Sequence, residues 1–154
     1  MMWIWKKYVI NTWKKNMAYR RIFIDSDIFI DVLLKREQFY KAGQKLLNIG
    51  RSEDTEICTS ALIIANILYI TVKALGKNEA KENVQKLLKL LTVFPLNADC
   101  ITLAMSSNFT DIEDAMQHFI AMQNQCDLII TRNLKHFKNS LLPIMSPDEY
   151  LRTI

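Results

Sequence analysis

Short runs of apolar residues alternate with longer helix-like segments along most of this 154-residue chain. Each run is too short for a helix and is continuously apolar, as expected of a strand that is buried on both faces. Strands alternating with helices form a parallel sheet between two helical layers. We therefore predict a three-layer α/β/α fold with a central parallel sheet of four to five strands. The expected strands are residues 21–25, 56–59, 92–94, 127–131 and 143–145.

The helices between these strands have recognisable beginnings. A side-chain oxygen of Ser26 or Asp27 would cap the helix after the first strand, and Thr110 or Asp111 would cap the helix before the fourth. A terminal helix opens at 146–149, with Pro147 near its first turn. The other expected helices are residues 39–49, 60–74, 78–91, 98–106 and 112–125.

The composition fits one compact domain, because 50% of the residues are hydrophobic and only 3 each are Gly and Pro. No apolar run reaches the roughly 18 to 20 residues of a membrane span. The longest, residues 61–72, contains Asn66 and is expected to be a core helix, with a dimer seam as the alternative. Cys58, Cys100 and Cys126 are widely spaced, which favours reduced thiols in a cytoplasmic protein over a zinc site or disulfides.

Residues 1–20 form a basic, aromatic extension that contains all 3 Trp, and residues 21–154 form the predicted domain. Six of the 20 basic residues and none of the 16 acidic ones lie in residues 1–21, so the remainder has 14 basic and 16 acidic residues. Charge alone therefore does not indicate nucleic-acid binding, and RNA would need a local basic rim. The extension would touch a membrane surface or RNA, or pack on the domain, unless translation starts at Met17.

Acidic side chains lie where strands end. Asp25 ends the first strand, and Asp111, Glu113 and Asp114 begin the helix that leads into the fourth. If these strands are neighbours, the acids converge at the carboxyl edge of the sheet, where open α/β sheets bind ligands. Crowded carboxylates resist ionisation, and a bound divalent cation relieves their repulsion. Oxygen donors favour Mg²⁺ or Mn²⁺. Each acid taken singly is also explained as a helix cap or a partner of the helix dipole.

Four segments of the chain form an ordered set: residues 22–34, 59–66, 111–117 and 127–137. Together they resemble the motifs of the PIN domain, the fold of many prokaryotic toxin–antitoxin ribonucleases. The first segment contains Asp25, and the third contains Asp114 in the place of the central acid of its motif. The resemblance starts at Arg21 and runs nearly to the end of the chain, and the spacing of the last two segments is its most specific part.

The chain departs from the family pattern at several motif positions. Ser26 and Asp27 stand where the family usually has Thr-Asn, and Asn66 stands where the second motif normally ends in Glu. Asn133 and His136 occupy the positions at which the fourth motif offers an Asp. An amide oxygen can bind a hard cation, but it brings no charge and cannot act as a base.

The resemblance implies a Mg²⁺- or Mn²⁺-dependent endoribonuclease that acts on RNA as the toxin of a pair. A small antitoxin protein would neutralise it, and a homodimer is expected by analogy. Asp25 and Asp114 would hold the metal directly or through water, with Asp111 or Glu113 as an auxiliary acid. The residues expected to support the site or contact substrate are Asp27, Asn66, Thr131, Arg132 and Asn133.

Other residues keep two interpretations. His118, four residues after Asp114, would touch the site or pack in the core. Arg132 and Lys135 would contact phosphates or be solvated turn charges. Asp31, one helical turn beyond Asp27, would support the site or face solvent.

Two competing functions follow from the same residues. Asn66 and His136 favour a catalytically weakened binding module that keeps the fold. Asp25 and Asp27 after a strand also resemble the aspartyl-phosphate phosphatases, in which the first Asp is a nucleophile. That family expects Thr or Val at the position that Phe29 occupies.

Overall fold

The predicted strands form one parallel sheet with the order β3-β2-β1-β4-β5. The computed structural model describes residues 19–50 and 54–154, so the expected extension lies almost wholly outside the described residues. The strands are β1 (Arg21–Ile24), β2 (Glu56–Ser60), β3 (Thr92–Phe94), β4 (Leu128–Ile130) and β5 (Ile144–Met145).

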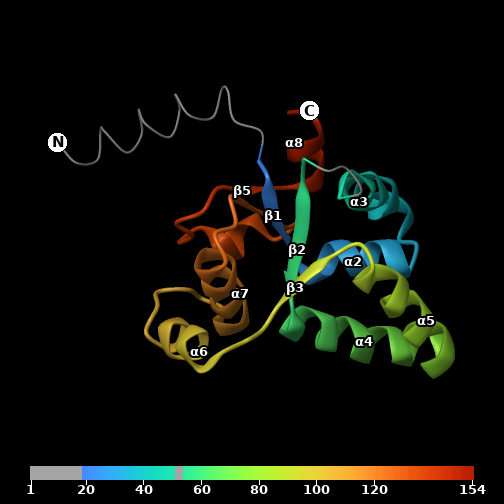
Figure 1. Ribbon diagram of the computed structural model, residues 1–154, viewed down its shortest axis with the longest axis horizontal. Helices are drawn as coiled ribbons and strands as arrows, with labels where there is room; N and C mark the ends of the chain where they lie inside the picture. Colours follow the sequence, from blue (N-terminus) through green and yellow to red (C-terminus); the bar gives the residue numbers. More distant parts are fainter. Residues whose placement is uncertain (1–18, 51–53) are drawn as a thin grey trace.

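Helices cover both faces of the sheet, which confirms the three-layer prediction (Figure 1). One layer contains α2 (Ser26–Leu33), α3 (Glu37–Ile49), α4 (Ala61–Leu75) and α5 (Lys77–Leu88). The other contains α6 (Ala98–Met105) and α7 (Ile112–Gln123). The short helix α8 (Pro147–Leu151) packs on α3, and a 3₁₀ turn, η1 (Leu134–Phe137), follows β4.

The central strand β1 is where the strand order reverses. The chain adds β2 and β3 on one side of β1 and then crosses to place β4 on the other side, with Ile24 opposite Ile130. Residues 22–24 of β1 and 128–130 of β4 are apolar and 0% exposed, because helices cover both faces of these strands. Open α/β sheets bind ligands beyond the carboxyl ends of the strands at such a reversal.

Several local expectations need correction. The N-cap of α2 is Asp25, not Ser26 or Asp27, because the backbone stays extended through Asp25 and becomes helical at Ser26. The helix expected at 78–91 ends at Leu88, since the chain must turn before β3 begins at Thr92. The turn η1 was not expected.

The apolar segment at 61–72 is only partly a core helix. Ile63, Ile67 and Thr71 of α4 are buried, whereas Leu68, Tyr69 and Val72 are exposed by 37% to 63%. The helix therefore has an apolar face that the rest of the described structure does not cover. No helix in the described part of the chain is long and apolar enough to cross a membrane.

The central strands should dominate stability. We expect Ile129→Ala in β4 to cost about 2 to 5 kcal/mol of unfolding free energy, because the side chain is 0% exposed and its loss leaves a cavity. The matched control is Ile101→Ala in α6, where the side chain is 39% exposed and the expected change is within about 0.5 kcal/mol. Urea unfolding of both variants measures the difference, and equal losses would contradict the placement of β4 in the core.

Candidate active site

Asp25 is held at the junction of the two central strands. Its backbone N–H donates to the Ile130 carbonyl at 3.0 Å, which continues the pairing of β1 with β4 by one residue. Its Oδ1 accepts from the Ser26 N–H at 2.7 Å, and its Oδ2 accepts from the Thr131 hydroxyl at 2.8 Å. Asp25 is 5% exposed, and this burial raises the pKa of its carboxyl. The backbone and Thr131 together fix the carboxylate in one orientation.

The first turn of α7 brings three further acids to the same place. Asp111, one of the two residues predicted to cap this helix, is the N-cap, and its Oδ1 accepts from the Asp114 N–H at 3.0 Å. Burial, followed by the charge of Asp25, raises the pKa of Asp114 to about 6. Burial, followed by the charges of Asp111 and Asp25, raises the pKa of Glu113. The charges of these acids therefore act on one another, as expected of carboxylates near one edge of the sheet, and they repel one another.

Asn66 reaches this cluster from α4. Its Nδ2 donates to Glu113 Oε1 at 2.5 Å. Asn66 stands where the second motif usually has an acid, and here its amide orients the carboxylate of Glu113. One turn further along α7, the buried Gln117 accepts from the Ser60 hydroxyl at 2.6 Å. Gln117 is a supporting residue that the sequence analysis missed. Gln117 lies three residues after Asp114 on the same helical face, and this spacing could have indicated that it supports the acids of α7.

His136 projects from η1 toward α7. Its Nδ1 lies 2.8 Å from Asp114 Oδ2. Asp111, Asp114 and His136 each offer one ligand atom, and these three atoms lie within 4.8 Å of one another. Carboxylate and imidazole donors at this separation can share a divalent cation, which would relieve the repulsion that raises the pKa of Asp114.

Arg132 belongs to a charged network behind the acids. Its backbone N–H donates to Asp27 Oδ2 at 3.0 Å, and its guanidinium lies 2.7 Å from Asp31 Oδ2 and 4.0 Å from the centre of the Phe39 ring. Asp31 is 1% exposed and is also paired with Arg36 at 3.4 Å. Asp31 therefore supports the site from inside the fold. The guanidinium of Arg132 is committed to Asp31 instead of extending freely toward a substrate.

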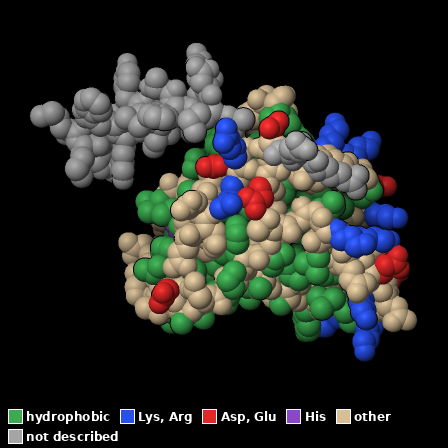
Figure 2. Space-filling view, in the orientation of Figure 1, with side chains coloured by type: hydrophobic (Ala, Val, Ile, Leu, Met, Phe, Trp, Pro, Cys, Tyr) green, Lys and Arg blue, Asp and Glu red, His purple; other side chains and the backbone are tan. Residues whose placement is uncertain are grey.

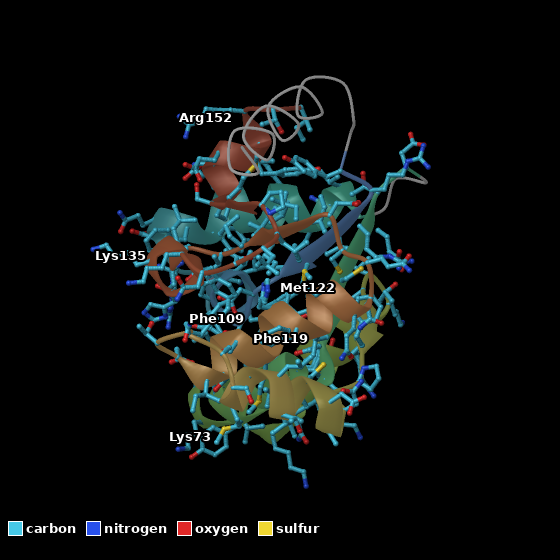
Figure 3. All side chains as sticks on the ribbon, turned by 90° about the vertical axis from the view of Figure 1, so that its left-hand side faces the viewer. Lys73, Phe109, Phe119, Met122, Lys135 and Arg152 are labelled. Carbon is cyan, nitrogen blue, oxygen red and sulfur yellow. The ribbon has the colours of Figure 1, made fainter. Side chains whose placement is uncertain are left out.

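The remaining singled-out residues divide into structural and exposed ones. His118 is 1% exposed and contacts the rings of Phe109, which precedes α7, and Phe119, which belongs to α7 (Figure 3). Burial lowers its pKa to about 4, so it is a neutral core histidine. Asn133 contributes its backbone N–H to Thr131 Oγ1 at 3.0 Å. Lys135 extends from η1 into solvent (Figure 3).

Asp27 should make the stability of the metal-free protein depend on pH. Burial, followed by the charge of Asp25, raises its pKa from 3.8 to about 7. The folded state therefore binds more protons than the unfolded chain between these values, and the stability contributed by this group falls as the pH rises. We expect Asp27→Asn to gain stability relative to the wild type as the pH rises through this window in EDTA.

Urea unfolding at several pH values measures this gain. The control is Ile101→Ala in α6, which removes no titratable group, so its difference from the wild type should stay constant with pH. A constant difference for Asp27→Asn as well would contradict the raised pKa.

A family model described as the PIN domain matches residues 21–135. Ribonuclease VapC1 of Aquifex aeolicus (strain VF5) is 22% identical over 139 residues, which cover 87% of this chain and 95% of that protein. VapBC2 from Rickettsia felis, solved with a DNA fragment of its promoter, is similar with a TM-score of 0.63, 16% identity, and coverage of 82% of this chain and 98% of that chain.

DNA-bound VapBC from Salmonella typhimurium is similar with a TM-score of 0.65, 14% identity, and coverage of 83% of this chain and 98% of that chain. At these identities the solved structures show the fold, and the match to the family model extends over most of the described domain. The chain belongs to the PIN domain family.

Proposed function

We propose that this protein is a metal-dependent endoribonuclease of the PIN type and the toxin of a toxin–antitoxin pair. The observation that carries the proposal is the convergence of the buried Asp25 with Asp114 at the switch point of the sheet. Two of the comparisons agree with it: VapC1 is a ribonuclease, and VapC20 of Mycobacterium tuberculosis, similar with a TM-score of 0.57, cleaves the sarcin–ricin loop. The family assignment replaces the phosphatase interpretation.

The side chains present fit a divalent cation. Asp111, Asp114 and His136 offer ligand atoms within 4.8 Å of one another, and the charge of Asp25 acts on Asp114 and Glu113. Arg132 of the fourth motif is paired with Asp31. Asp25 and Asp114 would hold Mg²⁺ or Mn²⁺, directly or through water. When bound, such an ion lowers the pKa of a coordinated water and neutralises charge on a phosphodiester.

The chain itself would orient the reacting groups. Thr131 and the Ser26 N–H fix both oxygens of Asp25, so this carboxylate does not reorganise during the reaction. Asn66 holds Oε1 of Glu113, whose raised pKa suits it to accept a proton from an attacking water. Asp111 keeps Asp114 at the start of α7 through the helix cap.

The expected macromolecular partners are RNA, a small antitoxin and a second copy of the chain, all in the cytoplasm. Lys and Arg side chains gather over α3 and α5 (Figure 2), where they offer a cationic surface to an RNA backbone. The solved relatives include a toxin–antitoxin complex from Klebsiella pneumoniae, which is similar with a TM-score of 0.64. We propose that the exposed apolar face of α4, formed by Leu68, Tyr69 and Val72, is covered by one of the protein partners.

The alternative is a weakened module that binds RNA or protein without cleaving it. It rests on Asn66 and His136, which replace acids of the second and fourth motifs. The two functions differ in metal binding, because a module without turnover has no need of the ion. Calorimetry that detects no binding of Mg²⁺ or Mn²⁺ at millimolar concentration would favour the module.

Asp25→Asn should abolish RNA cleavage. We expect a loss of at least about 100-fold in cleavage of single-stranded RNA with Mg²⁺ or Mn²⁺, because a direct ligand should matter more than its supporting neighbours. Asp99→Asn is the control, since Asp99 lies in the first turn of α6 beside the opposite end of α7. Equal cleavage by wild type and Asp25→Asn would point to a contaminating nuclease and refute the proposal.

Thr131→Val should damage the site through Asp25. Loss of the hydroxyl leaves a buried carboxylate oxygen without its donor, and we expect about 1 to 3 kcal/mol less stability and about 10- to 100-fold slower cleavage. The matched control is Thr59→Val, which removes a buried hydrogen bond of 3.1 Å to the Ile24 carbonyl. Cleavage assays and urea unfolding compare the two. If both variants lose activity equally, Thr131 has no specific role in orienting Asp25.

A further inference from the structure

The turn η1 is anchored at both ends, so His136 is held in place before any ligand arrives. At its start, the Asn133 N–H donates to Thr131 Oγ1, the same hydroxyl that binds Asp25. At its end, Phe137 is 1% exposed, and its ring packs edge-on against the ring of Phe109 with 6.3 Å between the ring centroids. His136 itself keeps about half of its side chain exposed, at 49%. A preorganised and accessible imidazole is suited to binding a ligand.

The distance from His136 to Asp114 matches that between neighbouring ligand atoms of one ion. Two neighbouring ligand atoms of an ion with bonds of roughly 2.0 to 2.2 Å lie about 3 Å apart when the geometry is octahedral. His136 Nδ1 and Asp114 Oδ2 are 2.8 Å apart. Asp111 offers a third atom within 4.8 Å of both, and only its Oδ1 is used by the helix cap. Among the described residues, this is the group of three that meets such a test.

A simple ion pair explains less of this arrangement. One exposed pair between a histidine and an aspartate contributes little to stability and needs no third carboxylate nearby. Here Asp111 and Glu113 flank Asp114, and the buried Asp25 faces the same group, so the negative charge exceeds what one imidazole can balance. The surplus negative charge favours a divalent cation among these side chains.

We propose that His136 is a metal ligand together with Asp111 and Asp114, and that its nitrogen makes this chain prefer first-row transition ions such as Mn²⁺ over Mg²⁺. The inference rests on the proposed metal-dependent function. Mg²⁺ favours an all-oxygen environment, whereas imidazole is a good ligand for transition metals. Replacement of the acid in the fourth motif by His136 therefore changes the choice of ion and keeps the site.

The test measures metal binding on the full chain after treatment with EDTA. Loss of the free Mn²⁺ signal in electron paramagnetic resonance gives the Mn²⁺ affinity, and competition gives that of Mg²⁺. We expect His136→Asp to lower the ratio of Mn²⁺ to Mg²⁺ affinity by about tenfold, because a carboxylate replaces the nitrogen donor. Pulsed measurements should show coupling of bound Mn²⁺ to an imidazole nitrogen in the wild type, and no coupling in His136→Asp.

His136→Gln and Lys135→Gln serve as matched controls on the same turn. His136→Gln removes the nitrogen donor without adding charge, so it should also lose the coupling, and it replaces His136→Asp if that variant does not fold. Lys135→Gln changes an exposed side chain and should keep both the coupling and the affinity ratio.

The outcomes separate this inference from the proposed function. If Mn²⁺ binds without nitrogen coupling and His136→Asp keeps the wild-type ratio, His136 is not a ligand, while the nuclease proposal stands. If Asp25→Asn abolishes Mn²⁺ binding and the nitrogen coupling persists in the wild type, both are supported. If neither the wild type nor any variant binds Mn²⁺ or Mg²⁺, the nuclease proposal and the role of His136 are both overturned.

Discussion

The burial of one carboxylate at the end of the central strand is the constraint on which the site depends. Asp25 has left water almost completely, and desolvation of a charged group is costly unless the group is hydrogen-bonded or paired. The fold meets part of that cost through the Ser26 N–H and the Thr131 hydroxyl. The first donor belongs to the start of α2 and the second follows β4, so elements packed in the core also orient the acid.

The acids of α7 make that burial harder to sustain. Asp114 and Glu113 share the field of Asp25, and the pKa values of both carboxyls are raised. A structure selected for stability alone would separate these groups, since the repulsion lowers stability wherever they ionise. Their crowding is therefore typical of a functional site. Arg132 does not relieve it, because its guanidinium pairs with Asp31 and Asp27 instead.

The parts of the molecule that depend on local pattern were predictable from the sequence. The parallel sheet follows from short apolar strands, and the meeting of Asp25 with Asp114 follows from strand ends that share one edge. The N-cap at Asp111 follows from its residue type and position. The domain boundary at Arg21 remains a prediction, as do the catalytic and metal-binding roles of the individual acids.

Long-range pairing was not predictable in the same way. Whether Arg132 meets phosphate or Asp31 depends on how α2 and α3 pack, and no local pattern carries that information. The burial of His118 depends on Phe109 and Ser140, which lie in different segments. The position of His136 beside Asp114 required the turn η1, whose formation depends on the anchoring of Phe137 in the core.

The pairing of β1 with β4 also has a consequence for how the protein is made. Thr131 and Asp25 are 106 residues apart in the chain, and Asp114 lies between them. A ribosome releases the chain from its N-terminus, so Asp25 leaves long before its hydroxyl donor and before the acids of α7. The acidic centre therefore cannot assemble before Thr131 has been synthesised. For a protein that would cut RNA, this order of emergence delays cleavage until the ribosome has passed the codon for Thr131.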